Sequence, residues 1–232
     1  MATQDISTAA ENENAPAEAL SFGIEEEYFL VHRDTRDLVR EEQPKLMAAL
    51  KAALGDQVCG EFLCSQIEIG TRVCHSPQDA RFELARLRNS VIELADSHGL
   101  SVMAASTHPF ARWSEQKVVD QPRYHDIAHD LADVGNRLST CGMHVHVGIE
   151  DRGTRIRTMN RARQFLPLLL ALSSSSPFWQ GRNTGLKCFR LAVTDSQPRS
   201  GLPERFDDWA HYKQAIALLR RSGAIDDPTK IW

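Results

Sequence analysis

Apolar residues recur every three or four positions in five segments of the chain, and this spacing predicts amphipathic helices. The first contains Leu46, Leu50 and Leu54 on one face and ends at Gly55, a residue that favours the position just after a helix. The second opens with Ser76-Pro77-Gln78-Asp79, where serine is a suitable N-cap and proline suits the first helical turn. The five expected helices cover about residues 46–54, 76–99, 123–137, 154–175 (bent or divided at Pro167) and 209–223.

Segments with alternating or continuous apolar residues lie between these helices and predict β-strands. The first begins at Ser21, where Phe22 and Ile24 precede the apolar run Tyr28–Val31 in spite of three consecutive glutamates. Residues 1–20 lack periodic apolar positions and are expected to form a disordered tail, so that one domain covers residues 21–232. Helices and strands alternate loosely, which predicts an α+β fold with an antiparallel or mixed sheet. The five expected strands cover about residues 21–31, 61–70, 100–107, 142–149 and 188–194.

The composition is that of a globular chain with no strong attraction for polyanions. The 232 residues are 42% hydrophobic and carry a formal net charge of −4, so neither nucleic acid nor a membrane surface is an expected partner. The longest apolar stretch, residues 165–172, is too short to span a bilayer. The first 32 residues contain no Lys or Arg, and the five cysteines form no C-x-x-C pair, so a cytoplasmic protein without disulfides is expected.

Three of the expected strands carry ionisable groups at alternate positions. Side chains two apart on a strand point to the same face, so Glu25 shares a face with Glu27, and His144 shares one with His146. Glu68 likewise alternates with two isoleucines. Each strand is therefore expected to be apolar on one face and to present potential metal ligands on the other.

Two interpretations fit these strands. Amphipathic strands with a solvated polar face explain any one of them, but glutamate is a poor strand former and two carboxylates on one face repel each other. A divalent cation would offset that repulsion. Carboxylates with an occasional imidazole favour Mg²⁺ or Mn²⁺, whereas the His-x-His pair alone would also suit zinc. The surplus of carboxylates and the lack of paired thiols favour the harder cations.

Six short motifs occur in an order that resembles one known family. They are Gly23-Ile24-Glu25-Glu26-Glu27-Tyr28, Ser65-Gln66-Ile67-Glu68, Met143-His144-Val145-His146-Val147-Gly148, Ser175-Ser176-Pro177-Phe178-Trp179-Gln180-Gly181-Arg182, Pro198-Arg199-Ser200-Gly201-Leu202-Pro203 and Thr229-Lys230-Ile231-Trp232. Together they closely resemble the carboxylate–amine ligases of the glutamate–cysteine ligase type 2 family, in its YbdK-like branch. The resemblance extends from about Ser21 to Trp232.

This resemblance implies a fold similar to the catalytic domain of glutamine synthetase, with an antiparallel or mixed sheet curved around the site and flanked by helices. It also implies a reaction in which ATP and Mg²⁺ (or Mn²⁺) convert a carboxylate into an acyl phosphate that an amine then attacks. The expected substrates are small amino acids, a glutamate-like carboxylate and a cysteine-like amine. The chain has no glycine-rich phosphate loop, so the nucleotide would bind by other chemistry.

The resemblance also assigns roles to individual residues. The implied metal ligands are Glu25, Glu27, Glu68 and one of His144 and His146, with His146 slightly favoured. Arg182 and Arg199 are candidates for holding the substrate carboxylate or a phosphate, because a guanidinium group binds either in bidentate fashion. A surface ion pair is the alternative for each arginine, and Arg190 is a weaker candidate of the same kind.

Three further features receive structural interpretations. His108 is expected to stabilise a turn rather than to take part in a site. Cys74 and His75 are adjacent, and since adjacent strand residues point to opposite faces, they are not expected to share a metal. Trp179 and Phe178 are expected in the core at the end of a helix.

The end of the chain departs from the family's pattern. Relatives continue after the Lys-Ile-Trp motif with residues that help to bind ATP and its metals, so the fold is expected to be incomplete at the C-terminus and the chain alone to be weakly active or inactive. An incomplete sheet would expose an unpaired edge, which favours association, and a homo-oligomer is one outcome. Two alternatives remain open: a metal-dependent hydrolase that uses the same Glu and His residues, and a non-catalytic chain that binds metal or a partner subunit.

Overall fold

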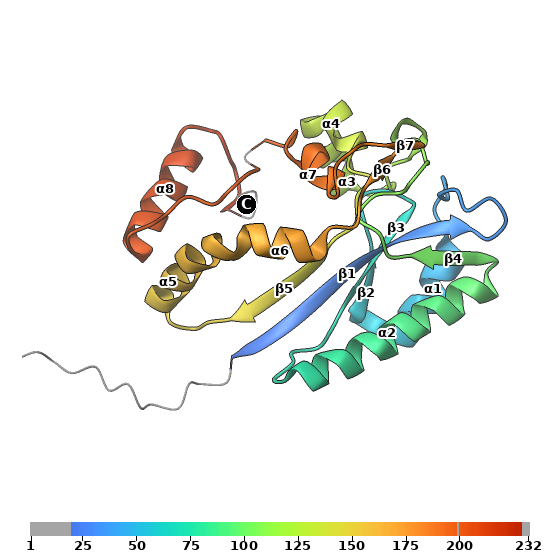
Figure 1. The fold of residues 1–232 in the computed structure, drawn as a ribbon, viewed down its shortest axis with the longest axis horizontal. Coiled ribbons are helices and arrows are strands. Elements are labelled where there is room, and N and C mark those ends of the chain that lie inside the picture. The colour runs from blue at the N-terminus through green and yellow to red at the C-terminus, as the bar shows by residue number, and fades with distance from the viewer. Residues whose placement is uncertain (1–19, 199, 229–232) are drawn as a thin grey trace, which may run out of the picture.

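The computed structural model describes residues 20–198 and 200–228, which form an α+β fold with an antiparallel sheet (Figure 1). The predicted fold class is therefore confirmed, whereas the predicted tail lies outside the described residues except for Leu20. The strands are β1 (Ser21–His32), β2 (Val58–Gly60), β3 (Gln66–Gly70), β4 (Leu100–Met103), β5 (Met143–Gly148), β6 (Phe178–Trp179) and β7 (Arg182–Asn183). The helices are α1 (Pro44–Leu54), α2 (Pro77–Ser97), α3 (Pro122–Leu131), α4 (Asp133–Asn136), α5 (Arg152–Ala162), α6 (Leu166–Ser173), α7 (Phe189–Thr194) and α8 (Trp209–Arg221).

The long strand β1 organises the main sheet, whose order is β2-β3-β1-β4 with β5 also paired to β1. Along one edge, β1 pairs with β3 through residues 25–29. It pairs with β5 through residues 21–26 and with β4 through residues 29–32, so these two strands follow each other along its opposite edge. Every one of these pairings is antiparallel. Residues from three separate parts of the chain are thereby brought beside β1.

Helices α1 and α2 pack on one face of this sheet and form the main core with it. In Figure 1 they lie on one side of β1, and the other helices lie on the opposite side. The core includes the fully buried Leu46 and Leu50 of α1, Leu87 of α2 and Ile69 of β3. The predicted start of α2 is confirmed, because the hydroxyl of Ser76 accepts a hydrogen bond from an amide in the first turn.

Two predicted elements differ in the structure. Residues 188–194 were expected as a strand but form α7, so that prediction is wrong. Cys188 makes a single parallel bridge with Ser176, but the pairing does not continue: the amides of Phe189 and Arg190 donate to the backbone and hydroxyl oxygens of Ser176 as the helix begins. A short apolar run does not by itself distinguish a helix from a strand. The expected helix at 123–137 is divided at Ala132, where φ is 46°.

The other predicted helices and strands are present as the predicted type of element but differ in length. The helix expected at 154–175 is divided into α5 and α6 by a 3-10 turn at residues 163–165, and Pro167 lies in the first turn of α6. Within the described parts of the chain, no helix is both long and apolar enough to cross a membrane.

A candidate metal centre on the open face of the sheet

The face of β1 away from α2 is divided into an apolar half and an ionisable half. Phe29 and Val31 point into a second core cluster, which includes Cys141 from the loop before β5. Glu25 and Glu27 lie on the same face, because they are four and two positions before Phe29 and side chains on one face of a strand recur every second residue. The carboxylates therefore lie at the margin of a packed apolar cluster and are partly exposed.

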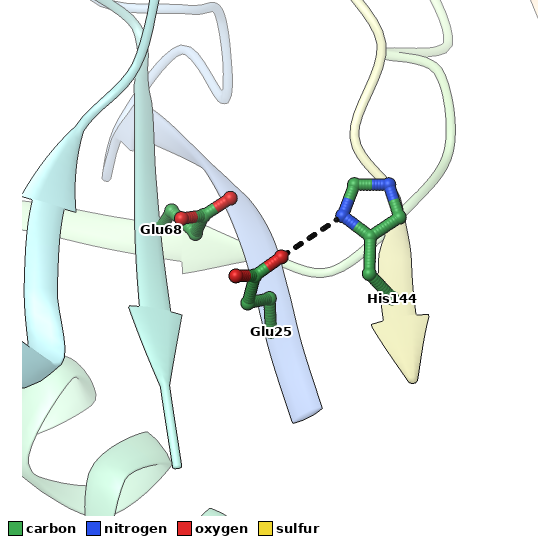
Figure 2. A group of neighbouring side chains, drawn as sticks. All are labelled: Glu25, Glu68 and His144. Atoms are coloured by element: carbon green, nitrogen blue, oxygen red, sulfur yellow. Dashed lines mark hydrogen bonds and ion pairs between the residues drawn. The ribbon is translucent and has the colours of Figure 1, made fainter. Parts of the chain in front are cut away.

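Three of the predicted ligands come together from three strands. Glu25 of β1, Glu68 of β3 and His144 of β5 each offer a ligand atom, and these atoms lie within 4.8 Å of one another (Figure 2). The strand register explains this, because Glu25 is directly opposite His144 and Glu27 is directly opposite Glu68. Cross-strand neighbours on one face are close enough for their side chains to meet.

Glu25 is held by both histidines of β5. Its Oε2 lies 2.8 Å from Nε2 of His146 and 3.3 Å from Nδ1 of His144. The hydrogen bond from His146 is the largest influence on the Glu25 carboxyl and, against opposing burial, lowers its pKa below the usual value. His144 thus belongs to the convergent group with Glu25 and Glu68, while His146, the histidine that the sequence slightly favoured, bonds to the same oxygen of Glu25.

The pKa of Glu68 is shifted in the opposite direction from that of Glu25. Burial raises the pKa of its carboxyl, and the negative charges of Glu25 and Glu27 raise it further. A divalent cation among these groups would favour the ionised form of Glu68 and offset the mutual repulsion. Two carboxylates and an imidazole are a donor set that suits Mg²⁺ or Mn²⁺, so the residues present fit such a cation.

Glu27 is fixed to the loop that leads into β5. Its Oε2 accepts a hydrogen bond of 2.8 Å from the amide of Gly142, and its own amide donates to the Gly142 carbonyl at 3.1 Å. The buried amide of Gln66 donates to the carbonyl of Thr140 in the same loop at 2.6 Å. These bonds hold the loop, and hence the first residues of β5, against β1 and β3. Glu27 shares the face but lies outside the convergent group.

A second group of potential ligands adjoins the first and was not predicted. Cys59 and Glu61, at alternate positions from β2 onward, lie with Glu68 so that one ligand atom of each is within 4.8 Å of the others. The thiol of Cys59 is 3.4 Å from Oε1 of Glu68, and burial together with that carboxylate raises the pKa of Cys59 to about 12. Cys59 and Glu61 are two positions apart, so their spacing in the sequence could have indicated that they share a face as potential ligands.

The predicted arginines occupy different places. Arg182 is exposed on the β6–β7 hairpin opposite Trp179, and Arg199 lies outside the described residues. Arg190 approaches the candidate centre: a Cβ atom added at Gly142 would lie 2.8 Å from its Nη2 and 3.8 Å from Nε2 of His144. The Nε atom of Arg190 is buried and has no hydrogen-bond acceptor among the described residues. Of the arginine candidates that the structure describes, Arg190 is therefore the one shown beside the centre.

The structure agrees with the structural interpretations of His108 and of the Cys74–His75 pair, whereas the interpretation of Phe178 is wrong. His108 is buried, its Nε2 lies 2.9 Å from the carbonyl oxygen of Arg36, and its Nδ1 accepts a bond of 3.0 Å from the amide of Ala111. Burial lowers the pKa of His108, which favours the neutral ring that these bonds require. Cys74 is buried while His75 is exposed, as expected for adjacent residues. Trp179 is in the core as expected, but Phe178 is exposed and both lie on strand β6 rather than at a helix end.

Two solved structures share this fold. A bifunctional glutathione synthetase from Pasteurella multocida superposes with a TM-score of 0.73 over 92% of this chain and 32% of its own, at 15% identity. A glutamate–cysteine ligase from Francisella tularensis, solved in complex with AMP, superposes with a TM-score of 0.57 over 68% of this chain and 36% of its own, at 16% identity. These similarities show that the chain has the fold found in these two ligases.

Sequence comparison assigns the chain to a family. The model of Glutamate-cysteine ligase family 2 matches residues 21–232, so the chain belongs to that family. The protein named "Putative glutamate--cysteine ligase 2" of Rhodospirillum rubrum is 48% identical over 218 residues, which are 92% of this chain and 56% of that protein. The protein of the same name from Paracoccus denitrificans is 48% identical over 212 residues, 91% of this chain and 56% of its own length. The chain thus spans about half the length of the curated relatives that it matches.

Proposed function

We propose that this chain carries the cation-binding face of an ATP-dependent carboxylate–amine ligase, with residues 21–232 as part of its catalytic domain. The proposed reaction transfers the terminal phosphoryl group of ATP to a glutamate-like carboxylate. The amine of a cysteine-like substrate then attacks the acyl phosphate and releases inorganic phosphate as the amide bond forms. The observation that carries the proposal is the convergence of Glu25, Glu68 and His144 within 4.8 Å in a chain of this family.

The side chains have separate tasks in this proposal. Glu25, Glu68 and His144 would hold the Mg²⁺ or Mn²⁺, while His146 and the Gly142 amide keep Glu25 and Glu27 in place. When bound, the cation would supply charge neutralisation at phosphate oxygens and hold donor and acceptor in line. The AMP bound in the Francisella tularensis ligase supports the use of an adenine nucleotide.

Arg190 is the arginine that we place at the substrate. Its guanidinium lies beside Gly142 and His144, and a carboxylate or phosphate oxygen is the kind of acceptor that its buried Nε lacks. Arg182 and Arg199 keep their proposed role as carboxylate- or phosphate-binding residues.

The test uses hydroxylamine as the amine, because it traps acyl phosphates as stable hydroxamates. With ATP, Mg²⁺ and glutamate, we expect wild-type protein to form the hydroxamate, at whatever rate this chain supports, and Glu68→Gln to lower that rate by about 100-fold or more. Glu93→Gln is the matched control, since Glu93 is an exposed glutamate on α2.

Three outcomes would count against the proposal. Equal rates for wild type and Glu68→Gln would exclude the centre from the reaction. Hydrolysis without nucleotide would instead support the metal-dependent hydrolase. If the wild-type protein shows no hydroxamate formation and no Mn²⁺ binding, both the ligase activity and the metal centre are contradicted.

A further inference from the structure

The middle residue of the Glu25-Glu26-Glu27 run has an environment unlike that of its neighbours. Glu26 points to the opposite face of β1, toward α2, and its residue is only 6% exposed. The side chains of Phe22, Ile24 and Leu84 line the open groove beside it, so the surroundings are mainly apolar. A carboxylate is costly to bury in such a place unless it is paired.

The pairing is supplied from α2 and from β1 itself. Nε of Arg88 donates to Oε2 of Glu26 at 2.8 Å, and Nη2 of Arg88 donates to Oε1, so the guanidinium and carboxylate form a two-point contact. The hydroxyl of Tyr28 also donates to Oε2 of Glu26. Arg88 is 62 residues away in the sequence, and this contact ties α2 to β1 at the residue between Glu25 and Glu27.

Stability alone is a weak explanation for this arrangement. A buried ion pair gives little net stabilisation compared with apolar side chains of similar volume, because both charges lose hydration. The fully buried Leu87 and Val91 of α2 already hold that helix to the sheet. Apolar contacts are not directional, so the core does not by itself fix the orientation of the Glu26 side chain. A two-point, charge-assisted contact is directional.

We propose that Arg88 and Tyr28 act through Glu26 as positioning residues for the cation ligand Glu25 and for Glu27, its neighbour on the same face. The inference rests on the proposed function, because it assumes that Glu25 binds a cation. Side chains alternate across a strand, so an anchor on Glu26 sets the direction in which both neighbours point. Glu26 is also opposite Met143 in the β1–β5 register, one position before the Glu25–His144 pair. The Arg88–Glu26 contact therefore lies next to the register position that brings the ligands together. Displacements of ligand atoms by about 0.5 Å are enough to weaken such a site.

The test measures cation binding rather than turnover, using Mn²⁺ as the probe and the whole 232-residue chain. We expect Arg88→Met to weaken Mn²⁺ binding by about 10-fold or more and to alter the electron paramagnetic resonance spectrum of the bound ion. Arg88→Lys, which keeps a charge but not the two-point contact, should restore part of the affinity. A role in folding alone would change the melting temperature without changing the spectrum of the bound ion.

The matched control lies two residues earlier on the same helix. Arg86 also links α2 to another element, since its guanidinium bonds to Oε1 of Gln57 at 2.5 Å and to Glu83 at 3.0 Å. Gln57 in turn donates to the backbone carbonyl of Gly70 and not to a ligand side chain of the centre. Arg86→Met should lower the melting temperature and leave the dissociation constant for Mn²⁺ within about twofold of wild type. If Arg88→Met does not fold, Tyr28→Phe removes one hydrogen bond to Glu26 at constant shape and should still weaken Mn²⁺ binding by a measurable factor.

The outcomes separate the two levels of inference. In one outcome, Glu68→Gln abolishes Mn²⁺ binding, but a folded Arg88→Met or Tyr28→Phe leaves both the affinity and the spectrum unchanged. This result would overturn the positioning role and leave the proposed centre intact. Wild-type binding that is absent, or insensitive to Glu68→Gln, would overturn the centre and the positioning role with it.

Discussion

At the scale of single residues, the three consecutive glutamates of β1 show how neighbours of one chemical type acquire different roles. Glu25 is bonded to His146, Glu26 to Arg88 and Glu27 to the amide of Gly142. For Glu26, burial alone would raise the pKa, but the hydrogen bonds from Arg88 and Tyr28 outweigh it, so the pKa of this carboxyl is lowered. Strand geometry then sends Glu25 and Glu27 to the open face and Glu26 to the helix-covered face.

The two histidines of β5 provide a test at this scale. Because His144 belongs to the convergent group and His146 bonds to Glu25 from the side, His144→Ala should weaken Mn²⁺ binding by about 100-fold and His146→Ala by about 10-fold. Isothermal titration of Mn²⁺ into each variant gives the two dissociation constants. The reverse order would show that His146 is the ligand and His144 the supporting residue.

At the scale of elements, α2 is the helix that holds β1 in place. Its buried residues, Leu87, Val91 and Ala95, lie on one face and pack with β3 and β4 in the main core. The opposite face is solvated and still contains the large apolar side chains Phe82 and Ile92, which are exposed. Stability at this helix therefore depends on which face a residue occupies rather than on its hydrophobicity.

This difference between faces predicts unequal effects of two truncations in α2. Leu87→Ala leaves a cavity at a residue with 0% exposure and should lower the free energy of unfolding by about 2–5 kcal/mol. Phe82→Ala removes a larger side chain that is 71% exposed, and we expect a change within about 0.5 kcal/mol. Urea denaturation followed by circular dichroism measures both. Similar losses for the two variants would contradict the assignment of the faces.

At the scale of the whole molecule, much apolar surface remains uncovered. Helix α6 is rich in leucine, yet in the described structure none of its residues is buried, and Leu168 and Leu172 are among those exposed. Met143, Val145 and Val147 on the apolar face of β5 are exposed as well. Apolar patches of this kind are uncommon on monomeric proteins and favour association.

Self-association through α6 is therefore expected, and a charged variant should reduce it. Leu168→Glu combined with Leu172→Lys places opposite charges four residues apart, which suits an exposed helix. We expect a larger monomer fraction in sedimentation velocity across a tenfold range of concentration, with the melting temperature unchanged within about 2 °C. A large fall in melting temperature would indicate that α6 is packed in solution, and an unchanged distribution would exclude it from the contact.

Much of this architecture could be predicted from the sequence because the signals are local. Leucines four apart predicted α1, the Ser76-Pro77 cap predicted the start of α2, and alternation predicted that Glu25 and Glu27, and separately His144 and His146, share a face. Local periodicity did not identify α7, since a short apolar run suits a strand or a helix and only the hydrogen bonds to Ser176 decide between them.

The sequence by itself therefore determined which faces carry ligands, because alternation along a strand is a property of the backbone. Only the tertiary structure decided which ligands meet. The antiparallel register sets Glu25 opposite His144 across 119 residues, and the packing of α2 brings Arg88 to Glu26. Gly142 likewise admits the guanidinium of Arg190 because it has no side chain. These contacts depend on strand order, register and the position of a helix on the sheet, and no spacing within one element encodes them.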